Sequence, residues 1–265
     1  MYRVKMNRAE RRRQLKADRK LVERGLDIAN RDSYQIVALM RVLHEHVREA
    51  IEAKSVQPLM AFIYSSMTET AKRLANAPLA CKRGCSHCCH IWVAASAPEV
   101  IYAVSSIPAA KRSACRQSVL IAEQETRDKS FDDRAGMVTR CPLLDDNLCS
   151  VYSTRPIVCR TAASADAAIC ERSYLHLSGE DIPTPFVFMA ARSGYDIGLC
   201  GALRREGLAD TASELISALK LVLETPDAEQ RWLRGEDIFA SLPKDPGSDL
   251  MNVPANRVFY NEAFG

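Results

Sequence analysis

Residues 34–51 read YQIVALMRVLHEHVREAI, and the spacing of the apolar side chains in this stretch decides the fold class. From Ile36 to Ile51 the apolar residues recur at intervals of three and four. That interval places them on one face of an α-helix. The stretch therefore predicts a long amphipathic helix, with Asp32 or Ser33 as its N-cap.

The rest of the chain repeats this helical pattern. Residues 57–74 carry it next, after a short polar connection that is typical of two antiparallel helices. Capping sequences and prolines predict further helices at residues 96–104, 108–126, 184–207, 211–223 and 225–233. No stretch of useful length alternates in the way that a strand requires. The sequence predicts an all-α fold, a helical bundle with irregular cysteine-rich metal-binding loops.

Composition and local character divide the chain into three parts. The 265 residues are 47% hydrophobic, which is normal for a globular chain. We expect a basic helical arm at residues 1–30 and a single helical domain at 31–242. Within that domain the cysteine cluster occupies residues 81–170. Residues 243–265 are rich in proline and polar side chains at their start, and we expect an extended C-terminal tail there.

The charge of the chain is unevenly distributed, and its net positive charge lies in the basic arm. The net charge of the whole chain is +3, but ten basic and three acidic residues give residues 1–25 a charge of +7 and leave −4 for the remainder. An arm of this kind can bind nucleic acid through phosphate contacts. Apart from Tyr2, however, no aromatic residue interleaves the charges to stack on bases. We therefore favour a solvated helical extension over a nucleic-acid partner.

The start of the chain, MYRVKMNRAERRRQLKADRK, lacks the apolar segment of a secretory signal. No stretch has the roughly 18 uninterrupted apolar residues that span a membrane, so we expect no membrane partner. These observations predict a cytoplasmic protein. Thiols stay reduced in the cytoplasm, where clustered cysteines are more often metal ligands than disulfides.

Seven of the ten cysteines fall into two short runs. The first run, residues 81–90, reads CKRGCSHCCH. Its spacings of three and four bring the thiols together if the segment is helical, and Gly84 allows a tight turn if it is not. Buried structural cysteines are the alternative, but the charged and polar neighbours in this run argue against it.

The second run, residues 141–160, reads CPLLDDNLCSVYSTRPIVCR. Residues 145–147 are a turn-forming cluster that would bring Cys141 and Cys149 to the same place. Arg155 and Pro156 end the preceding segment and begin a helix that carries Cys159.

Together the runs and one later cysteine give eight candidate thiolates. Soft thiolates are typical of zinc and iron–sulfur sites and not of magnesium or calcium sites. Eight of them could fill two four-ligand sites or one polynuclear site. The predicted metal ligands are Cys81, Cys85, Cys88, Cys89, Cys141, Cys149, Cys159 and Cys170. His87, His90 and His176 are reserve ligands, whereas Cys115 and Cys200 lie in amphipathic stretches and are predicted to be core residues.

The two motifs resemble a known family. C-x3-C-x2-C-C followed by C-P-L-L and C-x-x-Y-x-x-R-P-x-x-C-R is similar to the zinc- or iron-chelating cysteine cluster family, the YkgJ-like proteins. The resemblance covers roughly residues 75–165. Its matching residues are Cys81, Cys85, Cys88, Cys89, Cys141, Cys149, Tyr152, Arg155, Pro156, Cys159 and Arg160. A distant relative by this motif, the flagellin lysine-N-methylase, is linked to a [4Fe–4S] cluster in methyl transfer, so the resemblance favours iron.

We therefore expect a cytosolic cysteine-ligated metalloprotein that binds an iron–sulfur cluster or another iron site, with zinc as the alternative. Whether it is an enzyme stays open. A methyltransferase-like enzyme would act on a protein or small-molecule substrate and use Tyr152, Arg155 and Arg160 as cofactor-binding residues. Alternatively, the arginines cap carbonyls or pair with Asp145 or Asp146. A zinc-stabilised binding module is the third hypothesis.

Overall fold

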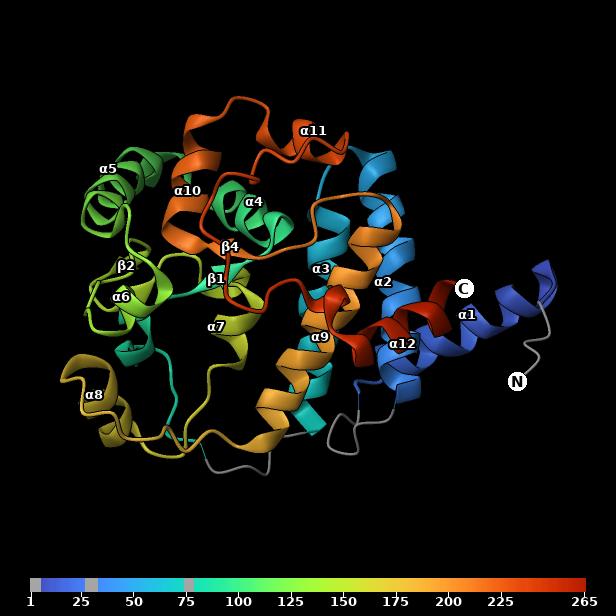
Figure 1. The fold of residues 1–265 in the computed structure, drawn as a ribbon, viewed down its shortest axis with the longest axis horizontal. Helices are drawn as coiled ribbons and strands as arrows, with labels where there is room; N and C mark the ends of the chain where they lie inside the picture. The colour runs from blue at the N-terminus through green and yellow to red at the C-terminus, as the bar shows by residue number, and fades with distance from the viewer. Residues whose placement is uncertain (1–5, 27–32, 74–78) are drawn as a thin grey trace.

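Nearly all the regular structure of the chain is helical (Figure 1). The computed structural model describes residues 6–26, 33–73 and 79–265. Twelve α-helices lie in these residues: α1 (Arg8–Glu23), α2 (Ser33–Ala53), α3 (Gln57–Arg73), α4 (Ala97–Ser105), α5 (Ala109–Thr126), α6 (Phe131–Ala135), α7 (Ile157–Thr161), α8 (Ala167–Leu175), α9 (Phe186–Arg205), α10 (Leu215–Glu224), α11 (Ala228–Leu233) and α12 (Pro254–Phe264). The predicted all-α fold class is confirmed.

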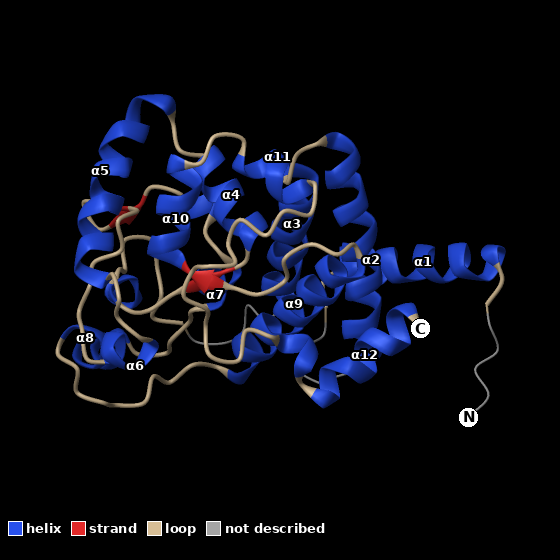
Figure 2. Ribbon diagram, turned by 45° about the horizontal axis from the view of Figure 1, so that its top comes forward, coloured by secondary structure: helices blue, strands red, loops and turns tan. Residues whose placement is uncertain are grey.

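Short elements fill the connections (Figure 2). Three 3-10 turns are described: η2 (His87–His90), η3 (Tyr152–Thr154) and η4 (Leu250–Asn252). Four strands of two residues each form two antiparallel pairs, β1 (Ala94–Ala95) with β4 (Ser213–Glu214) and β2 (Leu144–Asp145) with β3 (Leu148–Cys149). None of the described helices is both long and apolar enough to cross a bilayer.

The centre of the bundle is the contact between α2 and α9, which lie side by side in Figure 1. Small residues let the two backbones approach. A Cβ added at Gly198 would lie 3.1 Å from Cγ of Leu39, and one at Gly201 would lie 2.5 Å from Sδ of Met40. These two glycines therefore allow close packing of α9 on α2.

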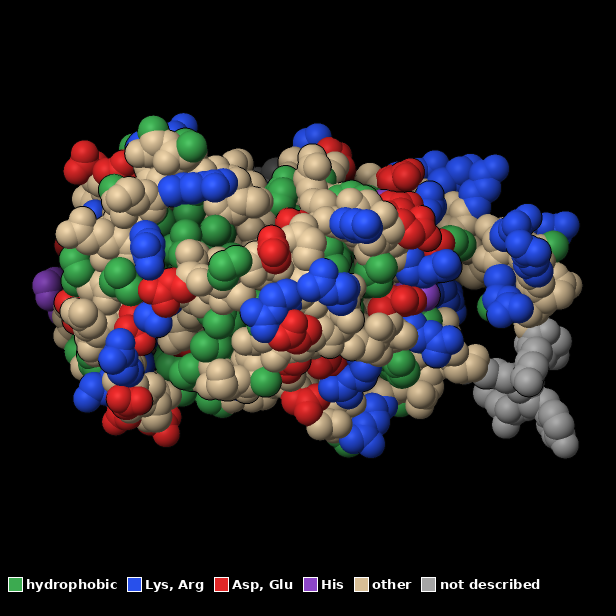
Figure 3. Space-filling view, turned by 90° about the horizontal axis from the view of Figure 1, so that it is seen from above, with side chains coloured by type: hydrophobic (Ala, Val, Ile, Leu, Met, Phe, Trp, Pro, Cys, Tyr) green, Lys and Arg blue, Asp and Glu red, His purple; other side chains and the backbone are tan. Residues whose placement is uncertain are grey.

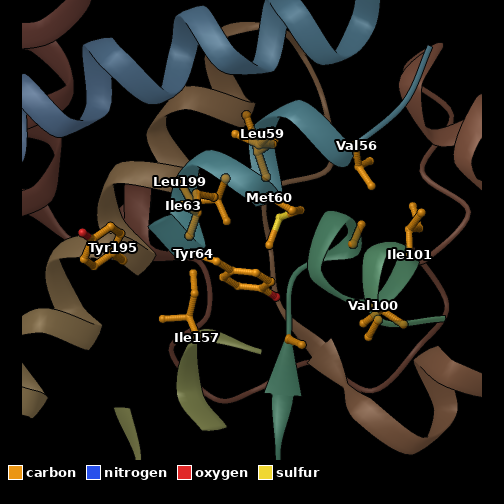
Figure 4. Close-up of a cluster of buried hydrophobic side chains, with 14 of the residues drawn as sticks. Val56, Leu59, Met60, Ile63, Tyr64, Val100, Ile101, Ile157, Tyr195 and Leu199 are labelled. Atoms are coloured by element: carbon orange, nitrogen blue, oxygen red, sulfur yellow. The ribbon is translucent and has the colours of Figure 1, made fainter. Parts of the chain in front are cut away.

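A buried apolar cluster joins α3, α4, α7 and α9 (Figure 4). Tyr64 from α3, Val100 from α4, Ile157 from α7 and Leu199 from α9 all belong to it. Ile157 is fully buried, although it opens a helix of only five residues. The core therefore anchors α7, the helix that carries Cys159.

Helix α1 is largely exposed but packs on α2, so the basic arm is helical where it is described. Val22 and Asp18 are fully buried. The Asp18 carboxylate accepts from Tyr34 Oη at 3.1 Å and pairs with Arg41 at 3.3 Å. Lys and Arg side chains gather at this end of the molecule in Figure 3. Residues 1–5 and 27–30 of the predicted arm, and Asp32, lie outside the described residues.

The structure differs from the expected extended tail, because residues 254–264 form helix α12. Phe259, Tyr260 and Phe264 pack on a small apolar cluster that includes Met40 and Ile197. Their spacing of one and four residues is helical, and Pro254 stands in the first turn, where its missing N–H costs nothing. The helix was not predicted because the start of residues 243–265 is rich in proline and the amphipathic pattern that follows it is short.

A second difference concerns the capping box predicted at residues 211–214. Ser213 and Glu214 instead pair with β1, and α10 begins at Leu215. Glu214 still caps the helix, since its Oε2 accepts from Ser217 N at 2.7 Å. The cap is thus three residues later than predicted because the strand pairing takes up the first residues of the motif.

Candidate metal centre

The first cysteine run forms a tight turn followed by the 3-10 turn η2. Gly84 adopts a φ of +92°, a value that L side chains rarely take, and Cys85 N donates to Lys82 O at 3.0 Å. Cys89 N donates to Ser86 O at 3.0 Å inside the next turn. The run therefore changes direction twice within nine residues and keeps its thiols within one small region.

Backbone hydrogen bonds join the first run to the second. Cys141 N donates to Cys89 O at 2.8 Å, and Thr139 N donates to His90 O at 3.2 Å. These bonds hold Cys141 beside Cys89, although about fifty residues separate them in sequence. The two motifs are thus brought together as the metal prediction requires.

The predicted turn between Cys141 and Cys149 is a hairpin. Leu144 faces Cys149 across the β2–β3 pair. Asp146 and Asn147 form its loop with φ values of 47° and 59°. Two successive residues with positive φ are typical of a type I′ hairpin turn, which asparagine and aspartate tolerate better than most residues. The turn prediction is confirmed, and the hairpin fixes the place of Cys149.

Helix α7 presents Cys159 and begins after Pro156, as predicted. Glu99 at the start of α4 holds this helix from outside. Its Oε1 accepts from Ile157 N at 2.6 Å, and its Oε2 accepts from Ser96 N at 2.8 Å. Burial raises the pKa of the Glu99 carboxyl, which is 4% exposed. A buried carboxylate thereby satisfies an N–H at the start of the helix that would otherwise have no partner.

Helix α8 supplies the eighth cysteine and packs on η2. Cys170 is buried in α8, one helical turn before Tyr174. Burial and the thiols of Cys88, Cys170 and Cys81 raise the pKa of Tyr174 to about 12. The prediction from sequence missed Tyr174, although its i+4 spacing from Cys170 is a usable signal.

Cys81 is the most exposed of the eight, but its sulfur already accepts a hydrogen bond. Ser164 N donates to Cys81 Sγ at 3.2 Å. N–H donors of this kind favour a thiolate and recur around metal-bound sulfur. The segment after α7 therefore orients the first thiol of the cluster.

The electrostatic interactions sort the thiols into two groups that share Cys88. The first thiol group is Cys81, Cys85, Cys88 and Cys170, and the second thiol group is Cys88, Cys141, Cys149 and Cys159. Members of each group lie close enough for their charges to interact. Cys89 joins both through a hydrogen bond with the thiol of Cys88, which together with burial raises the pKa of Cys88.

Burial is the largest influence on the pKa values of Cys141, Cys149 and Cys159 in the second thiol group. It raises the pKa of Cys141 to about 12 and the pKa of Cys159 well above its usual range, and the neighbouring thiols add to this effect. Because these thiols are buried and close together, ionising several of them without a cation would be energetically unfavourable. A bound cation would reverse the cost, because it stabilises every thiolate at once.

The donor set fits a thiolate-ligated metal, but the side chains are not arranged around a point. All ten cysteines are free. In residues 6–26, 33–73 and 79–265, no three Cys, His, Asp or Glu side chains converge closely enough to hold a metal ion as they stand. Metal binding therefore requires rotation of cysteine side chains on a backbone that already brings the two runs together.

The remaining sulfur and imidazole groups have other surroundings. Cys200 is buried in α9 and lies 3.5 Å from Asp210, in agreement with a core role. Cys115 in α5 packs against the main core but lies near enough to Cys141 to affect its charge. His90 Nδ1 is 3.1 Å from Ser86 O. His176 is exposed at the C-terminal end of α8.

The predicted cofactor-binding residues lie beside the second thiol group. The Arg155 guanidinium carbon is 4.0 Å from the centre of the Tyr152 ring, and Arg160 has the same distance to Tyr64. Arg160 also donates to the carbonyl of Ser153. The expected carbonyl cap is thus found for Arg160, whereas Asp145 pairs with Lys111 at 2.8 Å and not with either arginine.

A cleft of about 110 Å³ borders α7. Val158 lines it together with Glu99, Arg192, Asp196 and Asp245. Burial raises the pKa of Asp196 to about 7, and the charge of Glu99 adds to the shift while Arg192 opposes it. Arg192 pairs with Asp196 at 3.4 Å. This cleft carries no thiol of either group.

Comparison with known families bears on the same stretch of chain. Residues 80–176 match the family model CxxCxxCC, described as a "putative zinc- or iron-chelating domain". Over these residues the chain is similar to the cysteine cluster family. Both thiol groups lie inside the matched residues, and the resemblance seen in the two motifs is confirmed. A metal-binding role is supported. Comparison with curated proteins and with solved structures finds no match.

Proposed function

We propose that the cysteine cluster domain holds an iron–sulfur cluster or a related iron site, with Cys81, Cys85, Cys88, Cys89, Cys141, Cys149, Cys159 and Cys170 as its ligands. The observation that carries this proposal is the meeting of two thiol groups at Cys88. Hydrogen bonds between backbone groups of the two runs hold them together.

The number of thiols favours iron–sulfur chemistry over structural zinc. One tetrahedral zinc needs four ligands, and the two groups with Cys89 offer eight. Iron–sulfur clusters are held by cysteine thiolates and accept partly buried, low-polarity surroundings. Those are the surroundings of Cys141 and Cys159, whose acidity burial controls. When bound, such a centre would supply one-electron redox chemistry or a Lewis-acid site.

Anaerobic reconstitution tests the proposal. The full chain is purified without oxygen, incubated with ferrous iron and sulfide, desalted, and analysed for iron, acid-labile sulfide and visible absorption. We expect a brown protein with iron and sulfide in similar amounts. A colourless protein that contains stoichiometric zinc and still takes up no iron would overturn the proposal and favour the zinc-stabilised module.

A catalytic role remains a prediction. The cofactor-binding role of Tyr152, Arg155 and Arg160 was inferred for methyl transfer, and the described residues add no observation that favours this reaction. We also keep the cytoplasm as the proposed location, because clustered thiols remain reduced there.

A further inference from the structure

The guanidinium of Arg155 has a buried donor without an acceptor. Its Nε is shielded from solvent and makes no hydrogen bond with any of the described residues. In folded proteins the great majority of buried N–H groups are bonded, so each exception needs an explanation. The stack on Tyr152, 4.0 Å from the ring centre, fixes the plane of the guanidinium but leaves this donor unused.

No carboxylate serves as the acceptor for the Nε–H of Arg155. Asp145, one of the two acids that the sequence offers as a partner, is taken by Lys111. Within the described part of the chain no carboxylate oxygen lies within 4.0 Å of the Arg155 guanidinium. The missing acceptor must therefore come from other groups near Arg155.

The groups close to Arg155 are thiols. Its guanidinium lies close enough to the thiols of Cys88, Cys149 and Cys159 for its charge to interact with each of them. These three belong to the second thiol group. Sulfur that is bound to a metal is a better hydrogen-bond acceptor than a neutral thiol, because it carries negative charge.

The backbone around Arg155 is held in place on both sides. Tyr64 Oη donates to Thr154 O at 3.0 Å, and Ser106 Oγ lies 2.6 Å from Thr154 Oγ1. Pro156 follows directly and restricts the backbone of Arg155. The side chain thus leaves a rigid segment, which lowers the entropic cost of holding the guanidinium at one place.

We propose that Arg155 is a positioning residue of the metal centre, whose Nε–H donates to a metal-bound sulfur of the second thiol group. This inference rests on the proposed function. Hydrogen bonds and positive charge near cluster sulfur stabilise the more negative, reduced form, and both raise the reduction potential. Arg155 would therefore set the potential of the centre and slow the loss of metal, without being a ligand.

Three variants separate this role from a general charge effect. Arg155→Gln removes the positive charge and the N–H donors of the guanidinium. Arg155→Lys keeps the charge but lacks the Nε–H donor. Arg83→Gln is the matched control, because Arg83 is exposed and its guanidinium lies 6.0 Å from the same Tyr152 ring. Each full-length protein is reconstituted with iron and sulfide, and its iron content, helical circular dichroism and reduction potential are measured.

We expect Arg155→Gln to lower the potential, Arg155→Lys to give an intermediate value, and Arg83→Gln to stay near the wild-type value. Equal potentials in Arg155→Gln and Arg83→Gln would overturn the inference. Loss of both metal and helical signal in the two Arg155 variants would also overturn it and assign Arg155 to folding. If Arg155→Gln alone loses iron while it stays helical, the shifted potential of Arg155→Lys supports the inference.

Failure of the proposed function has a different signature. If the wild-type chain binds zinc and takes up no iron, the same variants are compared by the rate at which a chelator removes zinc. Arg155→Gln should then release zinc about tenfold faster than wild type, the range typical of lost outer contacts to metal ligands. Equal release rates in wild type, Arg83→Gln and Arg155→Gln would overturn the role of Arg155 for zinc as well.

Discussion

Cys88 is the residue on which the site depends most, because it interacts with thiols of both groups. We expect Cys88→Ser to lower metal affinity by at least about tenfold, since losing a ligand should cost no less than losing an outer contact. Cys200→Ser is the matched control, as Cys200 lies in the core beside Asp210. Metal content after reconstitution checks both variants. Full iron content in Cys88→Ser would remove Cys88 from the ligand set.

Asp196 predicts a pH dependence of stability. Burial and Glu99 raise its pKa from 3.8 to about 7, so the fold favours the neutral acid. As pH rises from about 4 to about 7, the unfolded chain loses this proton first and the folded state loses relative stability. Arg192 and Asp245 face the same cleft, where Arg192 opposes this rise of the Asp196 pKa and the charge of Asp245 adds to it.

Denaturant unfolding at several pH values tests this prediction. Asp196→Asn cannot ionise, so its free energy of unfolding should fall less than that of the wild type between pH about 4 and about 7. The side chain is 32% exposed, and solvent should reduce the difference below the value that the full shift implies. Parallel profiles for the two proteins would show that Asp196 has an ordinary pKa.

The sequence reveals some site residues and hides others for a physical reason. The cysteines can be recognised as candidate ligands from the sequence, because cysteine is a rare residue type and the spacing within each run is short. Glu99 carries no such signal, because a single acid is common in helices, and Tyr174 is marked only by its i+4 spacing from Cys170. Their roles depend on neighbours 58 residues away for Glu99 and on the packing of α8 against η2 for Tyr174.

At the scale of elements, α7 is too short to be stable alone, and Glu99 of α4 stabilises its first turn. We expect Glu99→Gln to lower the free energy of unfolding by about 1–3 kcal/mol, because the amide nitrogen cannot accept from Ser96. The variant should hold Cys159 less firmly in place, and iron uptake should fall as a result.

Glu236→Gln is the control for this change. Glu236 is exposed and pairs with Arg231 on the surface, so its loss should leave the free energy of unfolding nearly unchanged. Chemical denaturation of the two variants makes the comparison. A Glu99→Gln protein as stable as Glu236→Gln would mean that α7 does not need this carboxylate.

Helix positions followed from periodicity in α2 and α3, and from prolines and capping sequences in α4, α5 and α9. Residues 254–264 were not predicted as a helix, since three aromatic contacts with a small apolar cluster outweigh a start rich in proline and polar residues. The two-residue strands β1 and β4 could not be predicted, because they are defined by each other and lie far apart in sequence.

The whole molecule brings two cysteine runs together within a helical framework that has its own core. We therefore expect the metal-free chain to stay folded, since the fully buried residues of the cluster around Tyr64 and Leu199 include no thiol of the site, and Cys141 and Cys149 only pack against its edge. Metal should add stability, by about 2.7 kcal/mol when the free metal concentration is 100 times its dissociation constant.

Thermal unfolding with and without an anaerobic chelator measures that addition. The loaded protein should melt several degrees above the metal-free protein, and the far-ultraviolet circular dichroism of the two should be nearly the same at low temperature. Complete loss of helix on chelation would contradict an independent core and would favour a module that folds only with its metal.

The most direct test of the central claim is X-ray absorption at the iron and zinc edges of the anaerobically purified full chain. We predict an iron edge whose first shell consists of sulfur at about 2.3 Å, as expected for a thiolate-bound metal of this size, with a second shell of iron. A zinc edge with four sulfurs and no iron, or an iron shell of nitrogen and oxygen, would contradict it.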